Sequence, residues 1–142
     1  MQELATARRN EAIRALVGGL GARELRAVVV EPEVFDAIVD GLRDENPKIR
    51  WWCLQLLDHL DDERAIDAIA TCLDDPVPRV RRNAAHALGC FACKPSWDGA
   101  LSPAIHVRLA RLAESDPNAK VRAEAGRSLL CRPTAAAGAS AR

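Results

Sequence analysis

The sequence predicts an all-α protein, an α-solenoid of about four stacked, antiparallel helix pairs. The first observation is a motif that occurs three times, at residues 44–50, 75–81 and 116–122. It is a polar turn followed by an apolar residue and Arg. The second is that apolar residues return at helical spacing after each copy, without the alternation typical of strands. One such helix pair cannot bury its apolar face alone, so neighbouring pairs must stack.

The first 30 residues predict two atypical helices at the start of the stack. Residues 2–17 place their apolar side chains on one side of a charged helix, and three glycines end that helix before residue 22. Residues 22–30 predict a second, short helix. The pair matches the repeat weakly, and terminal repeats are often atypical because they cap the stack. We therefore expect residues 1–30 to be capping helices.

Residues 31–60 and 61–90 are the two repeats most alike, offset by 31 positions. In each, one amphipathic helix precedes the turn and a second helix follows it. Proline suits the first position of both second helices, where a missing N–H costs nothing. Asn46 can cap the earlier one, whereas Val77, at the same position of the next repeat, is a poor cap.

The third repeat, residues 101–131, is displaced by an insertion at residues 91–100. Ser102 and the proline after it predict the start of its first helix. The insertion, FACKPSWDGA, predicts an ordered loop that lies on a binding face or folds back over an apolar groove. Residues 1–132 are thus expected to be a single solenoid domain. The low-complexity residues 133–142 predict a disordered tail.

The stretch Asp75–Gly89, DPVPRVRRNAAHALG, resembles the repeat of the HEAT family, in the short variety also found in phycobilisome lyases. The resemblance extends from Pro32 to Leu130. It implies a solenoid in which the second helices of the pairs line a concave face. It also implies that the arginine of each copy pairs with an aspartate at a neighbouring turn, which is a structural role. These arginines are Arg50, Arg81 and Arg122.

Composition bounds the class of protein. With 142 residues, of which 49% are hydrophobic and 28% charged, the chain suits one soluble globular domain. No stretch resembles a secretory signal or is apolar over the length that a bilayer requires. Five cysteines at irregular spacing predict free thiols in a reducing cytoplasm.

The net charge is zero, but it is unevenly spread. Residues 31–75 carry thirteen acidic and four basic side chains, whereas residues 76–142 carry eleven basic and four acidic ones. A stack with one acidic and one basic end could dock a charged partner or associate head to tail with itself. A helix-rich surface is also charged without any such function.

The second helices carry the candidate partner-binding residues. Trp51 and Trp52 lie about 100° apart around one helix, so we expect one ring to pack and the other to reach the surface. Exposed Trp is a favoured interface anchor, although both rings could simply fill space. The predicted contact strip comprises Trp51 or Trp52, Gln55, Arg82, His86 and Arg127, with Trp97 added from the insertion.

His86, Cys90 and Cys93 are metal-ligand residue types at ligand spacing, and residues 90–93 form a C-x-x-C. A lone C-x-x-C is weak evidence, so buried, inert cysteines are favoured over a metal site. We therefore assign no catalytic residue, cofactor or metal.

The predicted function is a non-enzymatic scaffold that binds a protein partner on its concave face. One alternative is a lyase-like or metal-dependent role at His86/Cys90/Cys93. Another is nucleic-acid binding by the basic C-terminal half, against which the zero net charge and few aromatic residues argue. Two enzymes of HEAT-like repeats need residues missing here. Alkylpurine DNA glycosylases use a carboxylate near Trp, and no carboxylate lies one turn after either tryptophan. Deoxyhypusine hydroxylase uses His-Glu pairs.

Overall fold

The computed structural model describes residues 2–19, 21, 24, 31–90, 94–97 and 99–130. These residues contain helices and turns and no strand, so the all-α prediction is confirmed. The α-helices are α1 (Gln2–Val17), α3 (Pro32–Gly41), α4 (Pro47–Asp58), α5 (Ile66–Thr71), α6 (Pro78–Gly89), α7 (Pro103–Ser115) and α8 (Ala119–Leu130). Short 3₁₀ turns span Glu63–Ala65, Cys72–Asp74 and Pro95–Trp97.

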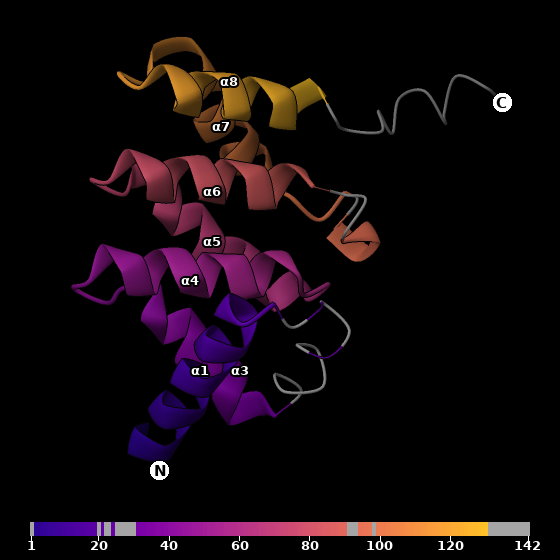
Figure 1. Cartoon of the computed structure of the whole chain (residues 1–142). Helices are drawn as coiled ribbons and strands as arrows, with labels where there is room; N and C mark the ends of the chain where they lie inside the picture. Colours follow the sequence, from indigo (N-terminus) through magenta and orange to yellow (C-terminus); the bar gives the residue numbers. More distant parts are fainter. Residues whose placement is uncertain are drawn as a thin grey trace, which may run out of the picture.

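The helices form two layers (Figure 1). Helices α4, α6 and α8, the second helices of the three pairs, lie one above another, with α6 in contact with both of the others. Helices α3, α5 and α7 form the layer behind them, and α1 packs against α3 and α4. Successive pairs are therefore stacked as the α-solenoid prediction requires.

The starts of the second helices follow the predicted capping chemistry. The Asn46 side chain accepts a hydrogen bond from the backbone N–H of Lys48, and Asn118 caps α8 in the same way. Val77 provides no side-chain cap. The Asp75 carboxylate, two residues before Val77, accepts a hydrogen bond from the Val77 N–H, as Asp44 and Asp116 do from the residues at the same position of the other turns. All three turns thus share the aspartate bond, and α4 and α8 have an asparagine cap in addition.

Arginine–aspartate pairs join each turn to the next. Arg50 donates two hydrogen bonds, of 2.7 and 3.0 Å, to the carboxylate of Asp75, and Arg81 donates two, of 2.8 and 3.0 Å, to that of Asp116. Each arginine also donates to carbonyl oxygens of its own turn. The hydrogen bonds from Arg81 lower the pKa of Asp116, although burial opposes this. The predicted pairing with an aspartate at a neighbouring turn is confirmed for Arg50 and Arg81, whereas Arg122 donates to the backbone carbonyl of Asp116.

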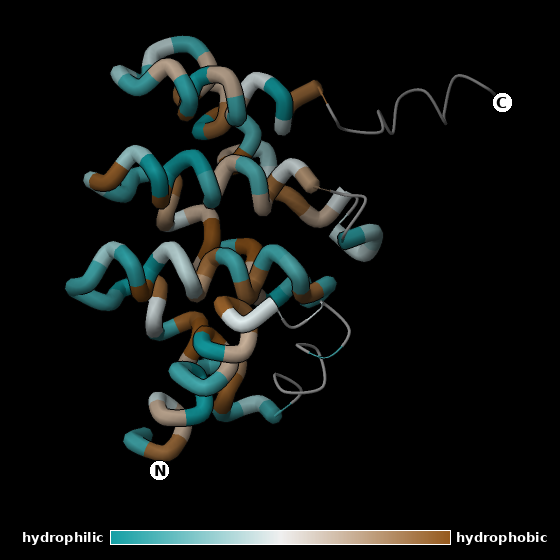
Figure 2. Tube along the Cα trace, viewed as in Figure 1, coloured by the Kyte–Doolittle hydropathy of each residue, from teal (hydrophilic) through white to brown (hydrophobic). Residues whose placement is uncertain are grey.

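Hydrophobic residues occur on helices of both layers (Figure 2). Their buried side chains form one core cluster that extends from Ala12 in α1 to Ala125 in α8. At the apolar position of the repeated motif, Val80 and Val121 are buried, and Ile49 is half-buried against the same core. The first two motif copies therefore contribute to this core, and α8, which begins in the third copy, contributes through Ala125.

Some predicted elements lie outside the described residues. These are the short helix at 22–30, of which only Glu24 is described, and the tail at 133–142. The insertion is described in part. Its Lys94 and Trp97 are both fully buried, and the Lys94 ammonium lies 2.5 Å from the Asp58 carboxylate of α4. These residues of the insertion pack back onto the stack.

Candidate functional site

A groove of about 460 Å³ opens on the face formed by the second helices α4, α6 and α8. This volume is within the ~300–1,000 Å³ typical of ligand-binding pockets. We call it the central groove. Its lining residues are Trp51, Gln55, Asp58, His59, Arg79, Arg82, Asn83, His86 and Glu124.

An aromatic and cationic wall closes one end of the groove. The rings of Trp51 and Trp52 meet edge to face, with centroids 4.5 Å apart. The Arg79 guanidinium lies over the Trp51 ring, 4.1 Å from its centroid. Both rings are half-buried. Trp51 lines the groove, whereas Trp52 takes part in a neighbouring hollow beside Lys48 and Val77.

The middle of the groove is polar. Gln55 of α4 donates a 2.7 Å hydrogen bond to the side-chain oxygen of Asn83 in α6. The Asn83 amide nitrogen is buried and has no hydrogen-bond partner among the described residues. A buried donor without a partner is uncommon in proteins.

At the other end of the groove, one histidine bridges two carboxylates. His86 of α6 places Nδ1 3.0 Å from Glu124 of α8 and Nε2 3.6 Å from Asp58 of α4. The network continues to Lys94, which lies against Asp58, and to Arg127, whose guanidinium is 2.6 Å from Glu124. Side chains of all three second helices are therefore connected across the groove.

The environment of Glu124 keeps this carboxyl ionised. Burial disfavours the charged form. Hydrogen bonds from Arg127 and His86 outweigh that effect and lower the pKa of Glu124. The result is a buried anion that holds cations at the groove surface.

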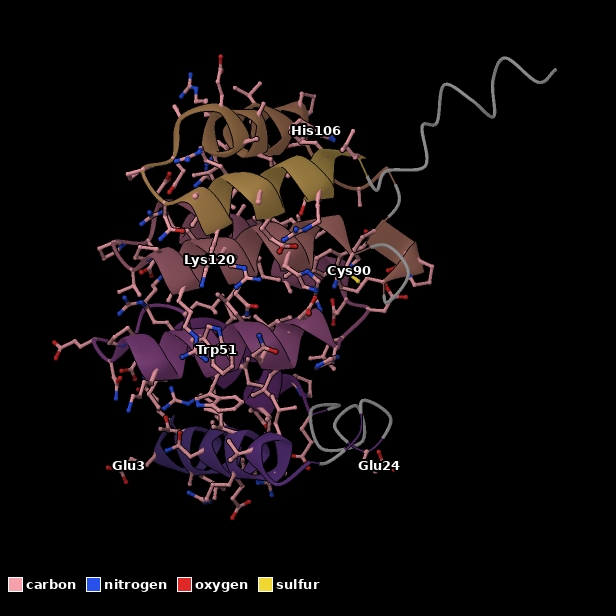
Figure 3. All side chains as sticks on the ribbon, turned by 45° about the horizontal axis from the view of Figure 1, so that its top comes forward. Glu3, Glu24, Trp51, Cys90, His106 and Lys120 are labelled. Carbon is pink, nitrogen blue, oxygen red and sulfur yellow. The ribbon has the colours of Figure 1, made fainter. Side chains whose placement is uncertain are left out.

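The acidic side chains of the groove are buried, whereas its arginine side chains are exposed. The side chains of Asp58 and Glu124 are only 9% and 10% exposed, whereas those of Arg82 and Arg127 are 48% and 58% exposed. Water or a ligand that approaches the groove therefore meets guanidinium groups first. Figure 3 shows that Lys120 of α8 lies on the same side of the stack as Trp51 of α4.

The structure brings most of the predicted contact strip together. Trp51, Gln55, Arg82 and His86 line the central groove, and Arg127 borders it through Glu124. Trp52 is adjacent to the groove but does not line it.

Trp97 requires a correction. It was expected as a contact residue on the insertion, but its side chain is fully buried and belongs to the hydrophobic core. Lys94 lies over its ring, with the ammonium 5.0 Å from the ring centroid. A ring buried in this way fills space between the insertion and the stack and offers no surface to a partner.

Four groove residues were not predicted from the sequence, namely Asp58, His59, Asn83 and Glu124. The repeat register contains a signal for two of them. Glu124 occupies the same repeat position as Asn83 and Trp52, which are 41 and 72 residues earlier. Comparing the polar residues at equal positions of the second helices would have identified that row. Asp58 has no such signal, since its partners come from the insertion and from α6.

The described residues contain no group of three or more His, Cys, Asp and Glu side chains that could hold a metal ion. His86 directs both ring nitrogens at carboxylates. Cys93, the third member of the predicted metal alternative, lies outside the described residues. Elsewhere in the core, burial raises the pKa of Cys53 to about 12 and that of Cys72 to about 11, so both are protonated thiols at neutral pH.

Comparison with known families agrees with this architecture. The model of the family described as HEAT repeats matches residues 2–89 and 35–130, which together cover most of the chain. The chain belongs to the HEAT-repeat family. HEAT repeats generally serve as scaffolds for protein–protein interaction and are typically non-enzymatic. No curated protein matches the chain. Within the described part of this HEAT-repeat protein, no helix has the length and apolar character of a membrane span.

Proposed function

We propose that this HEAT-repeat protein is a non-enzymatic scaffold that binds a protein partner in the central groove. The observation that carries the proposal is the convergence of one aromatic side chain and exposed guanidinium groups on the face formed by the three second helices. Trp and Arg are the residue types that dominate binding energy at protein interfaces.

The rigidity of the groove supports this proposal. Arg50–Asp75 and Arg81–Asp116 fix the relative positions of the turns that begin α4, α6 and α8. These pairs fix the backbone without using the side chains that line the groove. A partner can therefore bind those side chains with little reordering of the backbone. Preorganisation of this kind improves affinity by reducing the entropy lost on binding.

The groove chemistry favours binding over catalysis. Its carboxylates are engaged by Arg127, His86 and Lys94, so neither is a free general base. Among the described cysteines, Cys53 and Cys72 are buried thiols that form no disulfide, which suits the reducing cytoplasm that we propose as its location.

Site-specific crosslinking tests the proposal. A photoreactive phenylalanine analogue would replace Gln55 in the groove or, as a matched control, the exposed Asp67 on α5 in the other layer. In a lysate of the source organism we expect position 55 to give a discrete crosslinked protein and position 67 to give none. Arg82→Gln should reduce the yield of that product, whereas Arg111→Gln, which changes an exposed arginine of α7, should not. Equal crosslinking from positions 55 and 67 would contradict the proposal.

A further inference from the structure

We propose that the central groove takes an acidic peptide segment of its partner. This inference rests on the proposed function and adds the chemistry of what is bound. Four cationic side chains, those of Arg79, Arg82, Lys94 and Arg127, lie in or beside the groove with two carboxylates, which leaves an excess of two positive charges when His86 is not counted.

The excess charge is on the accessible side chains. Lys94 is fully buried and neutralises Asp58, and Arg127 forms a close pair with Glu124. The Arg82 guanidinium is 3.7 Å from the Glu124 carboxylate and donates no hydrogen bond within the described part of the chain. Its guanidinium therefore retains N–H donors for a ligand.

Arg79 is the second available cation. Among the described residues it contacts no carboxylate, and its guanidinium stacks on the Trp51 ring. Stacking fixes the plane of the guanidinium and leaves its N–H edge free, the arrangement that suits bidentate binding of a carboxylate. Arg79 and Arg82 are three residues apart on α6, so their side chains lie on the same face of the helix.

The size of the groove limits the ligand to a short segment. About 460 Å³ holds a few side chains rather than a folded surface. The two exposed guanidiniums, those of Arg79 and Arg82, would receive successive carboxylates, and the exposed Lys120 lies on the same side of the stack. A glutamate- or aspartate-rich segment matches this set of donors.

A nucleic acid matches it less well. A polyanion that followed the stack would run beside residues 31–75, a segment with thirteen acidic and only four basic side chains. Repulsion there would offset the counterion release that gives nucleic-acid binding its strength. In addition, Arg79 covers one face of the Trp51 ring, which limits the stacking platform that single-stranded bases use.

The test uses a fluorescein-labelled hexaglutamate peptide and the intact protein, with hexalysine and a Gly-Ser hexapeptide as controls. We expect saturable binding of hexaglutamate alone, weakened by added salt. Combining Arg79→Gln with Arg82→Gln should weaken binding about tenfold. Each substitution removes one exposed ion pair, and such a pair contributes roughly two- to fivefold to affinity. Arg79→Lys should have a smaller effect because it keeps the charge and loses the planar fork. Arg111→Gln should have none.

Three results would overturn the inference. If hexaglutamate fails to bind while position 55 still crosslinks a protein, the groove takes a partner of other chemistry and the proposed function stands. If both fail, both proposals fall. If oligouridylate binds more tightly than hexaglutamate and the same variants abolish it, the groove is a nucleic-acid site. Circular dichroism of each variant verifies that it is folded.

Discussion

Gly89 and Gly126 differ in the space around them, one being closely packed and the other open. They therefore offer a direct test of the packing between repeats. A Cβ atom added to Gly89 of α6 would lie 2.6 Å from the Cα atom of Ser128 in α8, and closer still to its side chain. A Cβ added to Gly126 would meet nothing within 4 Å. The close approach of α6 to α8 therefore depends on glycine at position 89 only.

The first prediction follows from this difference. Gly89→Ala should lower the free energy of unfolding by about 2 kcal/mol, because α8 must move away from α6. Gly126→Ala should raise it by about 0.5–1 kcal/mol, since alanine favours helix and has room. Urea denaturation followed by circular dichroism measures both. Similar effects of the two substitutions would mean that α6 and α8 do not approach as described.

The second prediction concerns acid stability. The folded protein lowers the pKa of Asp116, through hydrogen bonds from Arg81, and the pKa of Glu124. Both carboxyls therefore bind protons more readily in the unfolded chain, so their stabilisation is complete above the ordinary pKa values of ~4 and is lost as the pH falls below them. The free energy of unfolding should decrease from pH 5 towards pH 3.

The variant Asp116→Asn tests whether the Asp116 carboxyl contributes to the loss of stability in acid. It should be less stable than the wild type at pH 7 and show a shallower loss of stability towards pH 3, whereas Asp67→Asn on the exposed side of α5 should leave the slope unchanged. Urea midpoints at a series of pH values give the comparison. An Asp116→Asn protein with the wild-type acid slope would assign the pH dependence to other groups.

At the scale of the elements, the turn-to-turn arginines determine how one helix pair is placed on the next. Arg81 reaches from the start of α6 to the buried Asp116 carboxylate at the start of α8. Arg122 has the same position in the last pair, but in the described residues it donates only to the backbone carbonyl of Asp116. The same residue type thus joins one turn to the next in the first two repeats and has a local role in the last.

The third prediction compares these two arginines. Arg81→Gln should reduce the free energy of unfolding by about 3 kcal/mol, because it leaves a buried carboxylate without its partner. Arg122→Gln should cost about 1 kcal/mol, the value of a single hydrogen bond. Thermal or urea denaturation of both variants provides the test. Equal losses would show that the contact between turns is not what stabilises the stack.

The elements could be predicted from the sequence because their signals are local. Asn46, Ser102 and the prolines mark helix starts within a few residues, and the apolar spacing of each helix identifies its buried side. The insertion was less predictable. Whether Trp97 is a contact residue or a core residue depends on Lys94 and Asp58, which are 36 positions apart in the chain.

At the scale of the whole molecule, the architecture could be predicted because the sequence repeats. The groove could not, because it is built at positions where the repeats differ from one another. Residues shared by the copies, such as Arg50 and Arg81, form the framework. The groove is built from residues that differ between copies, including Asn83 and Glu124 at one repeat position. Sequence therefore identified Trp51, Gln55, Arg82 and His86 as a strip, but the buried carboxylates that organise these side chains needed the three-dimensional arrangement.

Hydrogen exchange of the protein with and without its crosslinked partner tests the central claim most directly. If α4, α6 and α8 form one docking surface, amides in all three second helices should be protected in the complex, with the largest change in residues 51–58, 79–86 and 120–127. Amides of α5 and α7 in the other layer should be unchanged. Protection confined to α5 and α7, or to the α1 end of the stack, would contradict the assignment of the central groove as the binding site.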